Sequence, residues 1–137
     1  MLKRILSCIG LVSLMVLMTG VLTAAAPMPV TTFTLVQGLP DVMNVGETAT
    51  VVVQVDSDQA FIFAQALPAA FFPGRGVVAA KGDHSGPGTN ATLSVPFHAK
   101  TSTSAFGGPV LVSVSVGVRY PGGYVAVQRY EFTVQVP

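Results

Sequence analysis

The chain has 137 residues, of which 50% are hydrophobic and only 9% are charged, and this composition argues against disorder and favours a single folded domain. Two of its seven basic residues, Lys3 and Arg4, lie at the amino terminus, which leaves five basic against six acidic residues and a net charge of −1 for the rest. Without a basic patch, nucleic-acid binding is not expected.

The amino terminus has the three parts of a secretory signal peptide. Lys3 and Arg4 precede a largely apolar run from residue 5 to residue 22, and small residues follow up to Pro27. We expect cleavage after Ala25 or Ala26, with 1–25 as the signal peptide and 26–137 as the mature domain. The alternative is an uncleaved anchor, because about 18 apolar residues suffice to cross a bilayer. Both interpretations place the domain outside the cytoplasm, secreted or at the cell surface.

Cys8 is the only cysteine, and it lies inside the apolar leader. A mature chain without cysteine has no disulfide, no thiolate metal site and no cysteine nucleophile. Its stability must therefore come from the packed core.

Alternating apolar and polar residues predict several short strands before the carboxy-terminal region. They are expected at 31–36, 48–55, 60–67, 77–80 and 93–98. The segments 56–59 and 82–90 are rich in Asp, Ser, Gly and Pro, and we expect them to be loops. Pro96 restricts its strand to an edge or to a ladder position that needs no N–H donor.

The last 28 residues predict a β-hairpin. Valines alternate with small or polar residues from 110 to 119, and Pro121-Gly122-Gly123 has the composition of a tight turn. On the return strand, the apolar residues of 130–136 share one parity, but Val125 and Val127 lie on the other. This change of phase predicts a β-bulge near residue 128, or a strand buried on both faces.

Six or seven strands with turns every eight to twelve residues predict an antiparallel β-sandwich. The stretch 45–55, VGETATVVVQV, resembles the start of the second strand in bacterial extracellular immunoglobulin-like modules, and 130–136 resembles their last strand. The tryptophan, cysteine pair and corner tyrosine of antibody domains are absent. The resemblance implies an immunoglobulin-like β-sandwich of about seven strands that serves in binding, adhesion or assembly.

Few residues have the chemistry of a catalytic or metal site. Asp83-His84-Ser85 contains the residue types of a hydrolase triad, but a triad is assembled from distant segments, so a polar loop is expected there. His98 falls on the polar parity of its strand. Asp56 and Asp58 offer too few oxygens for calcium unless other carboxylates fold close to them. No metal or cofactor is expected.

The segment 67–76 is the strongest candidate for a partner site. Its prolines predict a surface loop, yet it carries Phe71 and Phe72 followed by Arg75, and aromatic residues with arginine are enriched at binding hot spots. We expect these three residues to contact another protein or a cell-surface component. The alternative is that both rings fold back and close one end of the sandwich.

The sequence therefore predicts an exported, non-enzymatic binding, adhesion or assembly module. Two alternatives remain open: a small secreted hydrolase that uses His84 or His98, and a structural accessory that the uncleaved leader anchors in the membrane.

The tripartite leader yields a prediction about processing. Exported protein should begin at Ala26 or Pro27, because signal peptidase cuts after small residues. Intact-mass measurement of the exported material checks this. A chain that retains Met1 in the membrane fraction would support the anchor.

Overall fold

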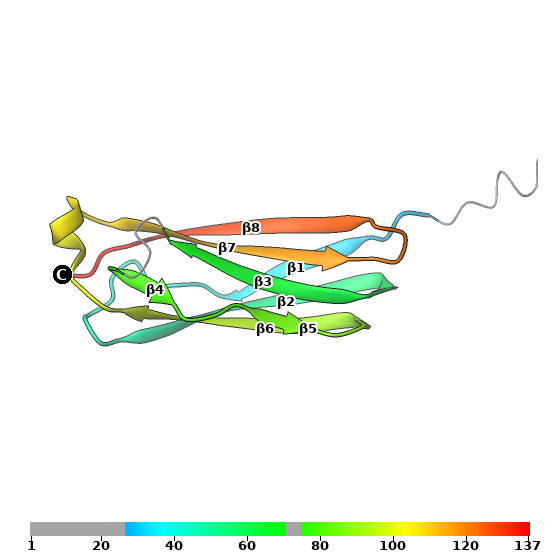
Figure 1. The fold of residues 1–137 in the computed structure, drawn as a ribbon, viewed down its shortest axis with the longest axis horizontal. Coiled ribbons are helices and arrows are strands. Elements are labelled where there is room, and N and C mark those ends of the chain that lie inside the picture. The colour runs from blue at the N-terminus through cyan, green and yellow to red at the C-terminus, as the bar shows by residue number, and fades with distance from the viewer. Residues whose placement is uncertain (1–26, 71–74) are drawn as a thin grey trace, which may run out of the picture.

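The computed structural model describes residues 27–70 and 75–137, which form two β-sheets packed face to face (Figure 1). The strands are β1 (Thr31–Gln37), β2 (Thr48–Phe61), β3 (Phe63–Ala70), β4 (Val77–Ala79), β5 (Asp83–Ser85), β6 (Gly88–Ala99), β7 (Val110–Arg119) and β8 (Val125–Val134). A short 3-10 helix, η1 (Thr103–Phe106), precedes β7. The strand orders are β1-β2-β6-β4 and β5-β3-β7-β8. The predicted all-β, immunoglobulin-like sandwich is confirmed, with eight described strands rather than about seven.

The chain crosses between the sheets soon after β1. Val42 forms a parallel bridge with Gln135, which lies just beyond β8. The Met43 N–H donates to the Gln135 carbonyl (3.0 Å), and the Gln135 N–H donates to the Asp41 carbonyl (2.8 Å). The segment that begins in the β2–β6 sheet thus also supports the β3–β7 sheet, at one end of β8.

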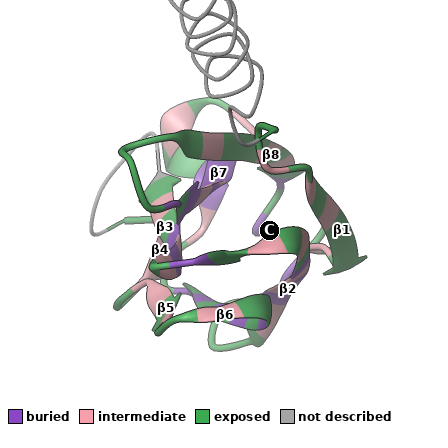
Figure 2. Cartoon of the chain, turned by 90° about the vertical axis from the view of Figure 1, so that its right-hand side faces the viewer, coloured by how far each residue is buried: buried purple, intermediate pink, exposed green. Residues whose placement is uncertain are grey.

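Alternation along the central strands fills the space between the sheets. The buried faces consist of Val51, Val53 and Val55 from β2, Leu93, Val95 and Phe97 from β6, and Val112, Val114, Val116 and Val118 from β7. Figure 2 colours the buried residues purple, and they recur along β2 and β7. The parity predicted for these strands is confirmed, because successive strand residues point to opposite faces.

The predicted carboxy-terminal hairpin is also confirmed. β7 and β8 pair from Val110↔Val134 to Arg119↔Val125. In the connecting turn the Gly123 N–H donates to the Tyr120 carbonyl at 3.2 Å, and Gly122 has φ 89°. Proline followed by a glycine with positive φ is the composition of a type II turn.

The β-bulge expected near residue 128 is wrong, and so is the alternative of a strand buried on both faces. The pairing of β7 with β8 has no shift in register, and most of β8 is exposed. Val125 and Val127 lie on the outer face and are 48% and 65% exposed. The apparent change of phase arises because β8 is an edge strand whose outer face carries apolar residues near the turn.

Two predicted loops contain strand. Residues 56–59 belong to β2, because Asp56 and Ser57 pair with β1 and Asp58 Oδ1 accepts the Val30 N–H at 2.8 Å. In the 82–90 segment, β5 pairs with β3, and Asp83 Oδ2 accepts the Ser94 N–H of β6 at 2.8 Å. In both places, acidic residues that resemble turn residues in the sequence accept backbone hydrogen bonds from a neighbouring segment.

Pro96 lies at a ladder position that needs no N–H donor, which is one of the two alternatives predicted for it; the other, an edge strand, is wrong. β6 lies inside its sheet, between β2 and β4. The Ser94 N–H points away from β2, toward Asp83, and alternation directs the Pro96 nitrogen to the same side. β4 ends at Ala79, opposite Phe97. No N–H donor is needed from Pro96 there.

A buried tyrosine ties the two sheets together at the turn end of the hairpin. Tyr120 is 1% exposed. Its hydroxyl donates to Ser57 Oγ of β2 at 2.7 Å and lies 2.5 Å from Thr31 Oγ1 of β1. Its ring packs edge-on against Phe61, with centroids 6.4 Å apart, and lies 5.8 Å from the ring of Tyr124. One side chain after β7 thus joins two strands, β1 and β2, of the opposite sheet.

The opposite end of the sandwich has a second buried polar contact. Thr103 in η1 is fully buried, and its backbone N–H donates to the Val136 carbonyl at 2.9 Å. Its Oγ1 accepts the Val136 N–H at 3.0 Å. This pairing holds η1 against the segment that follows β8.

The predicted leader, 1–25, lies outside the described residues, as does its cleavage site. Within the described ranges, no helix is long and apolar enough to cross a membrane.

The polar contact of Tyr120 can be tested with one substitution. Tyr120→Phe keeps the ring but removes the hydroxyl, and it should lower the free energy of unfolding by about 1–2 kcal/mol, because Ser57 and Thr31 each lose a partner. Chemical denaturation measures the change. Tyr124→Phe is the control, since Tyr124 is 38% exposed. Equal effects of both substitutions would contradict a special role for Tyr120.

Candidate functional site

Small residues occupy the middle of the outer face of β7, one of the two inner strands of the β3–β7 sheet, between Leu111 and Arg119. Ser113, Ser115 and Gly117 alternate with the buried valines on the outward parity; Ser113 is only 3% exposed, whereas Ser115 and Gly117 are partly exposed. The larger side chains of the neighbouring strands therefore stand on either side of a low central strip.

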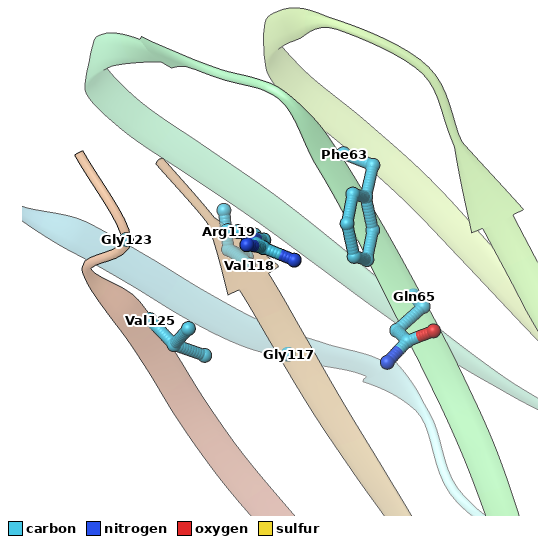
Figure 3. Close-up of a pocket in the computed structure, with 7 residues that line it drawn as sticks. All are labelled: Phe63, Gln65, Gly117, Val118, Arg119, Gly123 and Val125. Atoms are coloured by element: carbon cyan, nitrogen blue, oxygen red, sulfur yellow. The ribbon is translucent and has the colours of Figure 1, made fainter. Parts of the chain in front are cut away.

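A shallow depression of about 320 Å³ forms where this strip reaches Gly117 (Figure 3). The strand register builds it: Phe63 of β3 and Val125 of β8 both pair with Arg119, and Gln65 pairs with Gly117. Phe63 and Gln65 form one wall, and Val125 forms the other. We call this feature, lined by Phe63, Gln65, Gly117, Val118, Arg119, Gly123 and Val125, the Gly117 depression.

Its floor is open because Gly117 has no side chain. A Cβ atom built on Gly117 would meet no atom within 4 Å, and its φ lies outside the left-handed region. Neither backbone conformation nor packing therefore requires glycine here. Its absent side chain leaves the space above the strand empty.

Arg119 is the one ionised group among the residues that line the Gly117 depression. It is exposed, and among the described residues no carboxylate lies within salt-bridge distance of its guanidinium. Arginine donates to carboxylates in a planar, bidentate geometry. The depression thus combines an aromatic wall, an aliphatic wall and a cation without a carboxylate partner in the described chain.

A second depression, of about 450 Å³, lies on the outer face of the β2–β6 sheet. It is lined by Thr48, Val78, Ala79, Ala80, Pro96, Phe97, His98 and Lys100. His98 Nδ1 lies 3.2 Å from Thr48 Oγ1, and the Phe97 ring is buried in the core. This depression is larger but has no exposed Phe, Tyr or Trp ring, so it offers fewer of the contacts that dominate binding.

The predicted partner residues fall partly outside the described residues. Phe71 and Phe72 are outside them, and their role stays a prediction. Arg75 is exposed on a bend before β4 and lines neither depression. The loop expected at 67–76 is wrong for its first part, because residues 67–70 belong to β3 and pair with β7.

The two histidines of the hydrolase alternative lie on different sheets. His84 is in β5 of the β3–β7 sheet, whereas His98 is in β6 of the other. Asp83 Oδ1 accepts the backbone N–H of His84 rather than a ring N–H. In residues 27–70 and 75–137, neither imidazole is hydrogen-bonded to a carboxylate. The structure thus brings no histidine, carboxylate and nucleophile together in the part it describes.

The carboxylates considered for calcium are also dispersed. Asp56 pairs with Thr32 in the β1–β2 ladder, and Asp58 accepts the Val30 N–H. Across the described residues, no three side chains of His, Cys, Asp or Glu are grouped as metal ligands.

One tyrosine has a perturbed acidity: burial raises the pKa of Tyr130 in β8.

The sequence contained part of the signal for the Gly117 depression. Ser113, Ser115, Gly117 and Arg119 stand on the outward parity of the hairpin, and that parity is visible from alternation alone. Phe63 could not be placed beside them. Residues 60–67 are apolar on both parities, so the register of β3 against β7 was not available from the pattern.

No known protein family and no curated protein matches the sequence. Among solved structures, the E. coli alpha-2-macroglobulin aligns over 81% of this chain and 7% of its own, with TM-score 0.46 and 14% identity. AvmM, which catalyses macrocyclization in alchivemycin A biosynthesis, aligns over 80% of this chain and 89% of its own, with TM-score 0.46 and 14% identity. Murine CRIg aligns over 81% and 99%, with TM-score 0.36 and 8% identity. This chain therefore spans a small fraction of the macroglobulin, and none of the three identifies its ligand or activity.

The open floor yields a prediction about stability. Gly117→Thr should raise the free energy of unfolding by about 0.5–1 kcal/mol, because a β-branched residue replaces glycine in a strand without meeting other atoms. Thermal or chemical denaturation checks the change. A clear loss of stability would show that other atoms fill the space above Gly117.

Proposed function

We propose that this chain is an exported, non-enzymatic binding module that contacts a partner protein through the Gly117 depression. The observation that carries the proposal is the position of Arg119. It has no carboxylate partner in the described chain. It lies beside Phe63, at the edge of the space that Gly117 leaves unfilled. An open concavity with one cation and apolar walls is suited to binding rather than to acid-base chemistry.

The chemistry of the depression defines the partner. Phe63 and Val125 provide apolar surface for an aliphatic or aromatic side chain, and Arg119 would donate to a carboxylate beside it. Gln65 adds an amide that both donates and accepts hydrogen bonds. The partner we propose is a protein segment that presents an apolar side chain next to an aspartate or glutamate. On the outer face of β7, Ser115 and Gly117 are small, whereas Leu111 at the other end of the strand is 41% exposed.

Export is part of the proposal through the amino-terminal leader. Its basic start, apolar middle and small-residue end are the features that direct a chain out of the cytoplasm. An extracytoplasmic partner, in the medium or at the cell envelope, follows from this. The hydrolase alternative has less support, because His84 and His98 belong to different sheets.

The test is a capture experiment with matched variants. Immobilised wild type is incubated with the native culture medium and with solubilised cell envelope, and the proteins it retains are compared with those retained by Gly117→Thr and Arg119→Glu. The first variant fills the floor, and the second reverses the charge. We expect each to weaken binding of the specific partner at least about tenfold, equivalent to about 1.4 kcal/mol.

His98→Gln is the control, because it alters the depression on the other sheet and leaves the β3–β7 face unchanged. It should retain the partner as wild type does. Melting curves of all variants show whether the fold is intact. A partner that Gly117→Thr and wild type bind equally would contradict this proposal.

A further inference from the structure

β8 is the longest regular edge among the described strands. The edge strands β4 and β5 have three residues each. β1 pairs with β2 but shifts register between Leu35 and Gln37. β8 pairs with β7 through ten residues without a shift, and it contains no proline. A long, straight edge exposes a row of unpaired backbone groups that can pair with another strand.

Two sets of hydrogen bonds show which backbone groups of β8 point toward β7 and which point toward the open edge. At the turn, the Tyr124 carbonyl accepts the Tyr120 N–H across the hairpin, so the even-numbered residues direct their groups toward β7. At the other end, both backbone groups of Gln135 bond to the 41–43 segment on the opposite side. The N–H and C=O groups of Val127, Arg129, Glu131 and Thr133 therefore face the open edge, where the Arg129 carbonyl accepts a hydrogen bond from Gln128 Nε2 at 3.3 Å that a pairing strand would replace.

This parity restricts how a second copy could pair. Two antiparallel β8 strands must place odd-numbered residues opposite one another so that they exchange both hydrogen bonds. A two-fold axis at Arg129 or at Glu131 would oppose like charges, which is destabilising. An axis at Tyr130 instead places Arg129 opposite Glu131 of the second copy, and Glu131 opposite Arg129 of the second copy. In this register the odd-numbered residues exchange backbone hydrogen bonds, and opposite charges face each other.

We propose that two copies of this chain associate through their β8 edges, antiparallel, about a two-fold axis at Tyr130. The paired segment runs from Val127 to Thr133, because Gln135 is already bonded to the 41–43 segment. In a single copy, the Arg129 and Glu131 side chains lie 3.4 Å apart and are 58% and 53% exposed. In the dimer, the same two charges form a cross-strand group of four.

The side chains that would meet across the proposed interface are compatible on both the outer and the inner face of the joined sheet. Val127, which is 65% exposed, would lie opposite Thr133 of the second copy on the outer face. On the inner parity, the two Tyr130 rings meet at a pair without backbone hydrogen bonds, where side chains come closest. The two β3–β7 sheets would then join edge to edge with their Gly117 depressions on the same side. The pairing does not depend on what those depressions bind.

Charge exchange tests the register directly. Protein purified after export is examined by sedimentation velocity over a concentration series as wild type, Arg129→Glu, Glu131→Arg and the double exchange. The interface is small, so a reversible, concentration-dependent dimer is expected for wild type. Each single reversal opposes like charges at both symmetric positions and should weaken the dimer at least about tenfold.

The double exchange restores opposite charges, and it should dimerise as wild type does. An equimolar mixture of Arg129→Glu and Glu131→Arg should form a heterodimer, although neither variant pairs with itself. Melting curves should be alike, because both side chains are exposed. A wild type that stays monomeric at every concentration would overturn the proposal and identify these charges as protection of the edge. A dimer that both single reversals leave unchanged would overturn it as well.

Discussion

The valine alternation of β7 is the constraint on which the rest of this structure depends. Val112, Val114, Val116 and Val118 are buried between the sheets, next to the inner faces of β2, β6 and β3. The sequence contains one cysteine, Cys8, so no disulfide within the chain can hold the sheets together, and burial of this apolar face supplies the main stabilisation. A shift of β7 by one residue would turn every valine toward solvent. The register of the carboxy-terminal hairpin therefore determines the core.

The same register determines what the outer surface offers. Once the valines point inward, the serines and Gly117 must point outward, and a low strip forms along the centre of the β3–β7 sheet. Phe63, Arg119 and Val125 become neighbours across three strands because each occupies the matching position in the ladder. The odd-numbered backbone groups of β8 face the open edge for the same reason. The core, the depression and the edge thus follow from a single pairing of strands.

Much of this arrangement was predictable from the sequence. Alternation in 48–55, 93–98 and 110–119 placed the correct side chains inside, and Pro121-Gly122 predicted the turn. Such patterns are local, and a strand that is buried on one face must follow them. The apparent phase change at Val125 and Val127 was misleading, because an edge strand tolerates apolar residues on its outer face. Asp56 and Asp83 were misleading for another reason: each lies in a strand that pairs with a segment distant in the sequence.

The site was less predictable than the fold. Phe71, Phe72 and Arg75 attracted attention because they are neighbours in the sequence, whereas Phe63, Gly117 and Arg119 come together only through the pairing of β3 with β7. A polar anchor was missed in the same way, since Tyr120 reaches Ser57 and Thr31 across the sandwich. Contacts of this kind depend on long-range register, and no local pattern encodes it.

Residue-resolved amide hydrogen exchange along β8, measured by NMR in dilute solution, tests the hairpin register most directly. The account predicts alternating protection: slow exchange at Gln128, Tyr130 and Phe132, whose N–H groups face β7, and fast exchange at Val127, Arg129 and Glu131, whose N–H groups face the open edge. Uniform protection along the strand, or the opposite alternation, would contradict the register from which the core, the depression and the edge all follow.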